Sequence, residues 1–339
     1  MNRETTTTQT IARIGAPAAT NRLLYLVPLA MLLLVLPYIT PAYAYQRILL
    51  SYGLIFGIVA MGFNLLLGYT GLLSFGHSAF FGVGAYAAGF LIKYLNLRSM
   101  EAFLLAGMLG SALVAVVFGA ACVRYTRIFF SILTLALSQV IWALALKFFW
   151  ITGGTDGMRI PTPTLLGGLV NTGGDKLTFL ATTYYYYVLV VFSVCLALMW
   201  LIVNSPFGKA LQAIRDNETR AEFIGIPVRS YRWAAFIMSG LFTGVAGALW
   251  APLEGHVTPD ILYWPFSGEI VFMTVLGGFK SFAGPLLGAV VFNDLKAYAV
   301  GYTSYWQALL GVVLVVLVLT MPTGLIGVLS RVTSRLRRS

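Results

Sequence analysis

The chain has 339 residues, of which 59% are hydrophobic and 10% are charged, against roughly 45–50% and about 25% in an average soluble domain. Together with a mean hydropathy of +0.86, this excludes an ordinary soluble enzyme, a secreted disulfide scaffold and a disordered tail protein. The composition predicts an all-α integral membrane protein. Lysine and arginine outnumber aspartate and glutamate by 22 to 11, a net charge of +11, whose placement must be compared with membrane topology before nucleic acid is considered.

The N-terminal segment, residues 1–22, is polar and rich in threonine, with arginines before the first apolar run. That run, 23–40, is followed by Ala42-Tyr43-Ala44, which loosely fits a signal-peptidase site. The long polar segment before the run and the many apolar runs after it favour an uncleaved first helix over a cleaved signal peptide.

Apolar runs of about 20 residues, the length that a membrane-spanning helix needs, continue to the C-terminus. After 23–40 they cover 48–67, 78–97, 102–122, 128–150, 179–203, 233–252, a run that starts near 268, 282–300 and 305–328. We expect them to form one transmembrane domain, 23–328, followed by a basic tail, 329–339.

Basic residues orient these spans. The 204–232 loop, the short 123–127 turn and the tail are rich in arginine, whereas the 253–267 loop has two acidic residues and no lysine or arginine. By the positive-inside rule both termini are cytoplasmic, which requires an even number of spans, about ten if two short helices meet near Lys280. The excess charge is then a matter of orientation and contact with lipid, so no nucleic-acid partner is expected. Aromatic clusters at the outer ends, such as Tyr184–Tyr187, are typical of a membrane belt.

The stretch 68–89 is rich in glycine, which predicts close helix packing and an unwound or re-entrant segment at 68–77, beside a transport path. A similar break at 277–284 shares a Ser-Phe step with it, and inverted repeats are common in transporters. For His77 the alternative, a hydrogen-bonded structural side chain, has more weight than a role in transport. The polar and glycine residues that we assign to the path are Asn64, Gly71, Ser74, His77, Gln139 and Glu269.

The 204–232 loop is longer than the usual helix connection of about 2–8 residues. Ser205-Pro206 is typical of a helix start, and the helix that follows places Leu211 and Ile214 on one face.

Thr219 and Glu222 fit a capping box for a second short helix, which Gly225 and Pro227 end. Two short helices, apolar on one side and ionic on the other, predict a docking surface. The alternative is an interfacial segment held to anionic lipid by its arginines.

Several motifs are missing from the sequence. There is no phosphate-binding loop, no zinc-protease motif, no nucleophile elbow and no metal-ligand cluster, so we expect neither an enzyme nor a cofactor in this chain. A transport path without its own ATP site indicates that a partner supplies the energy. The alternative is an ion-coupled secondary transporter, which needs a carboxylate at mid-membrane, and Glu269 is the candidate for it.

Five stretches carry a resemblance to a known family. They are GYTGLLSFGHSAFFGVGAY (68–86), RIFFSILTLALSQ (127–139), TGGTDG (152–157), SPFGKALQAIRDNETRAEFIGI (205–226) and TVLGGFKSFAGPLLGA (274–289). Together they resemble LivM-type permease subunits of branched-chain amino acid ABC importers, along nearly the whole chain from about 48 to 328.

The resemblance implies a type II ABC importer fold in the bacterial inner membrane. It also implies a heterodimer with a LivH-like permease, two cytoplasmic ATPase subunits that bind ATP, and a periplasmic substrate-binding protein. The solute is a branched-chain amino acid or, as in other members of this type, urea, an amide or an aromatic acid.

The resemblance also assigns the 204–232 loop to ATPase coupling. We expect aspartate at Leu211 and Ile214 to break ATPase association without unfolding the membrane core. The coupling residues that it implies are Phe207, Gly208, Leu211, Ile214, Arg215, Glu218, Arg220 and Glu222.

Overall fold

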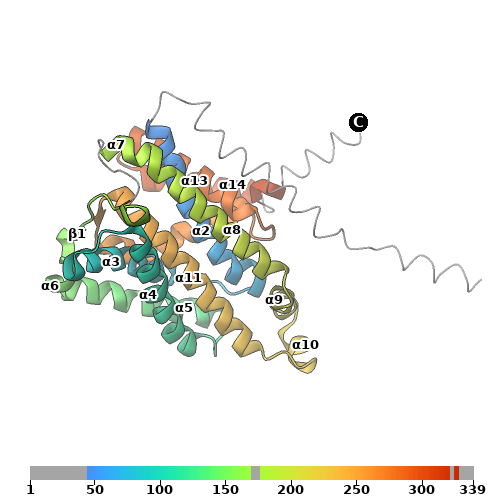
Figure 1. Cartoon of the computed structure of the whole chain (residues 1–339). Helices are drawn as coiled ribbons and strands as arrows, with labels where there is room; N and C mark the ends of the chain where they lie inside the picture. Colours follow the sequence, from blue (N-terminus) through green and yellow to red (C-terminus); the bar gives the residue numbers. More distant parts are fainter. Residues whose placement is uncertain (1–43, 169–175, 321–323, 328–339) are drawn as a thin grey trace, which may run out of the picture. The chain divides into compact units, whose positions relative to one another are not determined.

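The computed structural model describes residues 44–168, 176–320 and 324–327. The expectations for the N-terminal segment, the first span at 23–40 and the basic tail lie outside these residues. The described part is largely helical, and its two short strands pair antiparallel with Met158 opposite Val257. Figure 1 shows the long helices packed side by side.

The helices and strands follow in chain order. The first group is α2 (Ala44–Thr70), α3 (His77–Leu95), α4 (Met100–Cys122), α5 (Arg127–Lys147), α6 (Phe149–Thr152), η2 (Gly154–Asp156), β1 (Met158–Arg159), η3 (Leu166–Gly168), α7 (Lys176–Phe179), η4 (Leu180–Tyr184) and α8 (Tyr185–Asn204). The second group is α9 (Pro206–Asp216), α10 (Glu218–Phe223), α11 (Val228–Glu254), β2 (His256–Val257), η5 (Pro259–Leu262), α12 (Trp264–Gly277), α13 (Gly284–Tyr302) and α14 (Trp306–Thr320).

Six segments of the described chain are long and apolar enough to cross a membrane. They correspond to α2, α3, α4, α5, the continuous run from α7 to α8, and α11. These segments coincide with six of the predicted apolar runs. The last third of the described chain holds the three helices α12, α13 and α14, where the sequence predicts two short helices and a final span.

The centre of this part is formed by α2 and α11. Their apolar windows are 78% and 72% buried, against 22% for α5, and α11 packs against α2, α3 and α4. The backbones approach closely because small residues face each other: a Cβ at Gly84 would collide with the carbonyl oxygen of Gly244. Such contacts take the place of a hydrophobic driving force between helices inside a membrane.

The outer helices α4 and α5 present apolar side chains to their surroundings. The exposed residues of α4 include Leu105, Leu109, Leu113 and Val117. Those of α5 include Ile128, Phe129, Ile132 and Val140. Faces of this kind require lipid or a protein neighbour, since a chain in water would not expose them.

A non-helical link is present at each predicted break, but the first is shorter than the expected 68–77, because α2 stays helical through Thr70, and it joins two separate spans instead of interrupting one. The first lies between α2 and α3, at 71–76, where Gly71 has φ +73°. The second lies between α12 and α13, at 278–283, where Gly278 has φ +105°. A positive φ is strained for residues with a Cβ, so glycine is the residue that these turns need.

Candidate functional site

The 278–283 break lies against the last turns of α2, which lead into the first break. The side-chain Nδ2 of Asn64 donates to the carbonyl oxygen of Ser281 over 3.5 Å. A Cβ at Gly68 would collide with both Asn64 Oδ1 and the carbonyl oxygen of Phe279. We call this meeting point of the α2 end with the 278–283 break the junction. Asn64 is buried, and its Oδ1 has no hydrogen-bond partner among the described residues.

His77 begins α3 and is fully buried beside the first break. Its Nε2 lies 2.8 Å from the hydroxyl of Ser239, which donates its own hydrogen to the carbonyl oxygen of Gly62. Ser239 therefore accepts from Nε2, and Nδ1 of the neutral ring accepts from Ser74 over 3.2 Å. Both nitrogens are satisfied, which is the geometry of a structural histidine that fixes α3 against α11.

The 204–232 loop folds into α9 and α10, at the lower right of Figure 1, between the end of α8 and the start of α11. The Ser205 hydroxyl caps α9 by accepting from the amide of Gly208, and proline stands at its first turn, as predicted. The start of α10 differs from the capping box that the sequence predicts at Thr219. Asn217 caps it instead by accepting from the amide of Arg220, because a short amide side chain is among the best residues at this position.

The apolar face of α9 points inward. Leu211 belongs to a buried hydrophobic cluster with 0% of its surface exposed, and Ile214, 2% exposed, packs with Ala221 and Val228. Phe207 stacks on Tyr231 of α11 with ring centroids 5.4 Å apart. The expectation that Leu211 and Ile214 offer an exposed docking face is therefore wrong, because these side chains hold the loop to the rest of the chain.

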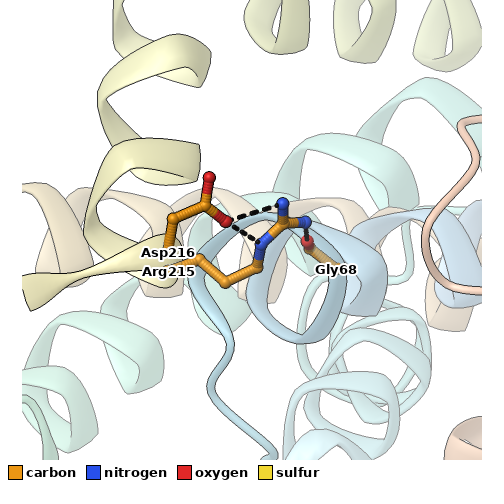
Figure 2. Close-up of polar contacts among 3 residues, drawn as sticks. All are labelled: Gly68, Arg215 and Asp216. Atoms are coloured by element: carbon orange, nitrogen blue, oxygen red, sulfur yellow. Dashed lines mark hydrogen bonds and ion pairs between the residues drawn. The ribbon is translucent and has the colours of Figure 1, made fainter.

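Two arginines anchor the loop to the spans. Figure 2 shows Arg215, whose Nη1 donates to the carbonyl oxygen of Gly68 over 2.5 Å and whose Nε and Nη2 bind Asp216. Arg232 of α11 makes two hydrogen bonds, of 2.6 and 2.8 Å, to the carboxylate of Glu218. The side chain of Arg232 is 7% exposed and that of Glu218 is 40% exposed, so the arginine end of this bidentate pair is shielded from water and the carboxylate end is not. Through Arg215 the loop contacts the last turns of α2, where the junction begins.

The exposed part of the loop is its tip. Arg220 and Glu222 are exposed, and the two following residues, Phe223 and Ile224, are 87% and 69% exposed although both are apolar. Phe223 and Ile224 are not among the coupling residues expected from the sequence. Their position directly before Gly225, which has φ +85° and ends the helix, is the signal that could have indicated an apolar tip.

Two other predicted path residues, Gln139 and Glu269, form no hydrogen bond or ion pair with the junction among the described residues. Gln139 is half-buried on α5, and its Nε2 has no partner among the described residues. Glu269 of α12 forms an ion pair with Lys296, with Nζ–O distances of 2.8 and 2.7 Å. No group of three or more metal-ligand side chains occurs within the described residues.

Comparisons with known proteins agree with this architecture. A family described as "Branched-chain amino acid transport system / permease component" matches residues 47–318. The chain is 27% identical to the high-affinity branched-chain amino acid transport system permease protein LivM of Escherichia coli (strain K12), covering 80% of this chain and 68% of that protein.

Two further relatives bear similar names. The permease protein LivH of Salmonella typhimurium is 26% identical over a match that covers 81% of this chain and 92% of LivH. The permease protein BraD of Pseudomonas aeruginosa is 24% identical over a match that covers 82% of this chain and 93% of BraD. No solved structure matches the chain. Since the family match covers most of the chain, the protein belongs to the permease components of branched-chain amino acid transport systems.

Proposed function

We propose that this chain is the permease subunit of an ATP-driven importer and forms half of its translocation path. The solute is a branched-chain amino acid or a related small amphipathic molecule, since the names of the relatives specify branched-chain amino acids. The chain itself carries no cofactor, and ATP is bound by the partner subunit.

The proposed topology has about ten spans, with both termini in the cytoplasm of a bacterial inner membrane. The 23–40 run and the three helices α12, α13 and α14 add four spans to the six long segments. The arginine-rich loop with α9 and α10 lies on the same side as the 123–127 turn. The type II importer fold belongs to this proposal, and the match to the permease family supports it.

The proposed complex contains a second, LivH-like permease, two ATPase subunits and a periplasmic binding protein. Similarity of one chain to both LivM and LivH supports a pair of related permeases that face each other. The apolar outer faces of α4 and α5 provide surface for lipid and for such a neighbour.

One observation carries the coupling role: an exposed apolar tip stands on a loop that is firmly anchored to the spans. Phe223 and Ile224 are the most exposed apolar side chains of the loop, and apolar anchors of this kind dominate protein interfaces. Closure of an ATPase dimer would push on α10. The push reaches α11 through the Glu218–Arg232 pair and the junction through the bond from Arg215 to Gly68.

The test replaces the tip residues and measures the ATPase that remains bound. Phe223→Asp combined with Ile224→Asp should lower the amount of ATPase that copurifies at least about tenfold, because the loss of a central apolar anchor costs about 2 kcal/mol or more. The matched control is Tyr302→Asp, which removes an aromatic side chain of similar exposure, 86%, from the opposite end of the spans. Undiminished ATPase on the tip variant would contradict a docking role for α10 and favour contact with lipid.

The alternative of an ion-coupled secondary transporter rests on Glu269. Its carboxylate forms an ion pair with Lys296 and lies in the second turn of α12, nearer the outer end of the spans than the mid-membrane position of a coupling carboxylate. The family match favours the importer.

A further inference from the structure

A cavity of about 640 Å³ lies at the ends of α2 and α11 that are opposite to the 204–232 loop. Tyr52 lines it near the start of α2, and Gly68, which binds the loop, lies about 24 Å further along the same helix. The volume is within the range of roughly 300–1,000 Å³ that small-molecule sites occupy. Residues of α2, α11, η5, α12, α13 and α14 line the cavity.

Part of the wall is aromatic. Phe56, Trp250 and Phe266 line the cavity, and Phe81 packs behind them with ring centroids 4.7 Å from Phe266 and 5.7 Å from Trp250. We call the three lining rings the aromatic floor. Packed rings give a fixed apolar surface on which an aliphatic group can lie.

The cavity also holds three carboxylates and one ammonium group. Glu269 and Lys296 neutralise each other and are 21% and 31% exposed. Glu254 and Asp260, which we call the acidic rim, have no basic side chain within 4 Å among the described residues. The Tyr52 hydroxyl donates to Oε2 of Glu254 over 2.6 Å, which fixes the direction of that carboxylate. The cavity therefore offers two carboxylates that form no ion pair among the described residues, beside an apolar surface.

We infer that this cavity binds an apolar α-amino acid in its zwitterionic form. The ammonium of the ligand binds the acidic rim through charge-assisted hydrogen bonds, and its aliphatic side chain lies on the aromatic floor. The ligand carboxylate faces Lys296. A carboxylic acid without the amine would meet the two carboxylates of the acidic rim and be repelled.

This inference rests on the proposed function, since it assigns the class of solute and a station on its path. The cavity lies at the predicted outer ends of the spans, where a solute released by a binding protein would enter. Binding here requires neither ATP nor the ATPase. Loss of ATPase association and loss of ligand binding are therefore separate results.

The test uses L-photo-leucine, a photoreactive leucine analogue, on the full chain in lipid nanodiscs with the subunits that accompany it and without a binding protein. After irradiation, mass spectrometry should find labels on peptides covering 48–56, 250–269 and 293–307. Leucine and leucinol, which both carry an ammonium, should suppress labelling, whereas 4-methylpentanoate at the same concentration should not. Absence of labels from these peptides, or equal suppression by 4-methylpentanoate, would overturn the inference.

Two variants locate the recognition of the amine. Glu254→Gln combined with Asp260→Asn should reduce labelling about tenfold, since each charged hydrogen bond contributes appreciably to binding. Asp156→Asn, an exposed carboxylate outside the cavity, is the control and should leave labelling unchanged. Unchanged labelling of the double variant would also overturn the inference.

A second double variant tests the ammonium group of the cavity. Glu269→Gln with Lys296→Met removes the ion pair without changing the net charge. It should weaken the competition by leucine and leave that by leucinol intact. If leucine and leucinol both compete less well, and to the same extent, the placement of the ligand carboxylate is contradicted. This second double variant can be measured even if the rim variant fails to assemble.

Discussion

At the scale of single residues, His77 shows how a conspicuous polar side chain can serve structure. Both ring nitrogens are hydrogen-bonded, and the ring packs edge-on against Phe63 and Phe80. His77→Ala leaves a buried cavity and two serine hydroxyls without this partner, so we expect a loss of about 2–4 kcal/mol in stability. The measurement is the melting temperature of the purified protein in detergent. A normal melting temperature with transport abolished would instead indicate a direct role in transport.

Leu211 supplies a second prediction at this scale. Because its side chain is fully buried in the core, Leu211→Asp places an unpaired carboxylate among apolar groups, which costs several kcal/mol. We expect a large loss of folded protein, measured by size-exclusion chromatography of a fluorescent fusion. Arg220→Gln, at an exposed position of the same loop, should leave the yield unchanged. A folded Leu211→Asp chain that only loses its ATPase would restore the docking role that the sequence assigned to Leu211.

At the scale of elements, the end of α2 and the loop act together. Gly71 has φ +73°, and a Cβ there would lie 3.1 Å from Cγ of Arg215. Gly71→Ala therefore costs about 1–2 kcal/mol in backbone strain and displaces the arginine from Gly68. Gly268→Ala is the control, because no atom lies within 4 Å of its added Cβ. Equal melting temperatures for the two variants would contradict this account of the turn.

The bond between Arg215 and Gly68 also predicts a defect in coupling. Arg215→Gln should retain the ATPase in the purified complex while solute transported per ATP falls roughly fivefold or more, the scale of a lost coupling free energy of about 1 kcal/mol. The two quantities are measured together in proteoliposomes. Full coupling in this variant would show that the loop acts on the spans by another route, such as the Glu218–Arg232 pair.

The elements also show what sequence can and cannot predict here. Apolar runs, glycine breaks and the Ser205-Pro206 start are local signals, and the structure has elements at each of them. The direction in which α9 faces is not local. An amphipathic helix can turn its apolar side toward a partner or toward its own chain. From the sequence we expected Leu211 and Ile214 to face a partner, whereas they face their own chain. The cavity at Glu254 combines residues from six elements, and no sequence spacing connects them.

At the scale of the whole molecule, the two ends of the described spans should lie on opposite sides of the membrane. Phe223 and Tyr302 are both more than 80% exposed and lie at opposite ends. Cysteine at 302 should react with an impermeant maleimide in intact spheroplasts, and cysteine at 223 only after permeabilisation. Cys122 and Cys195 are buried, so the background is low. Reaction of both cysteines from the same side would contradict the proposed topology.

The central claim is that this chain works as one of two permeases driven by a separate ATPase. The most direct test is affinity purification of the tagged chain, expressed at its native level and solubilised in mild detergent, with identification of every protein that accompanies it. We predict an ATPase and a second, related permease in fixed ratio. A stable homo-oligomer without any ATPase would contradict the claim and make Glu269 the first residue to test as an ion-coupling site.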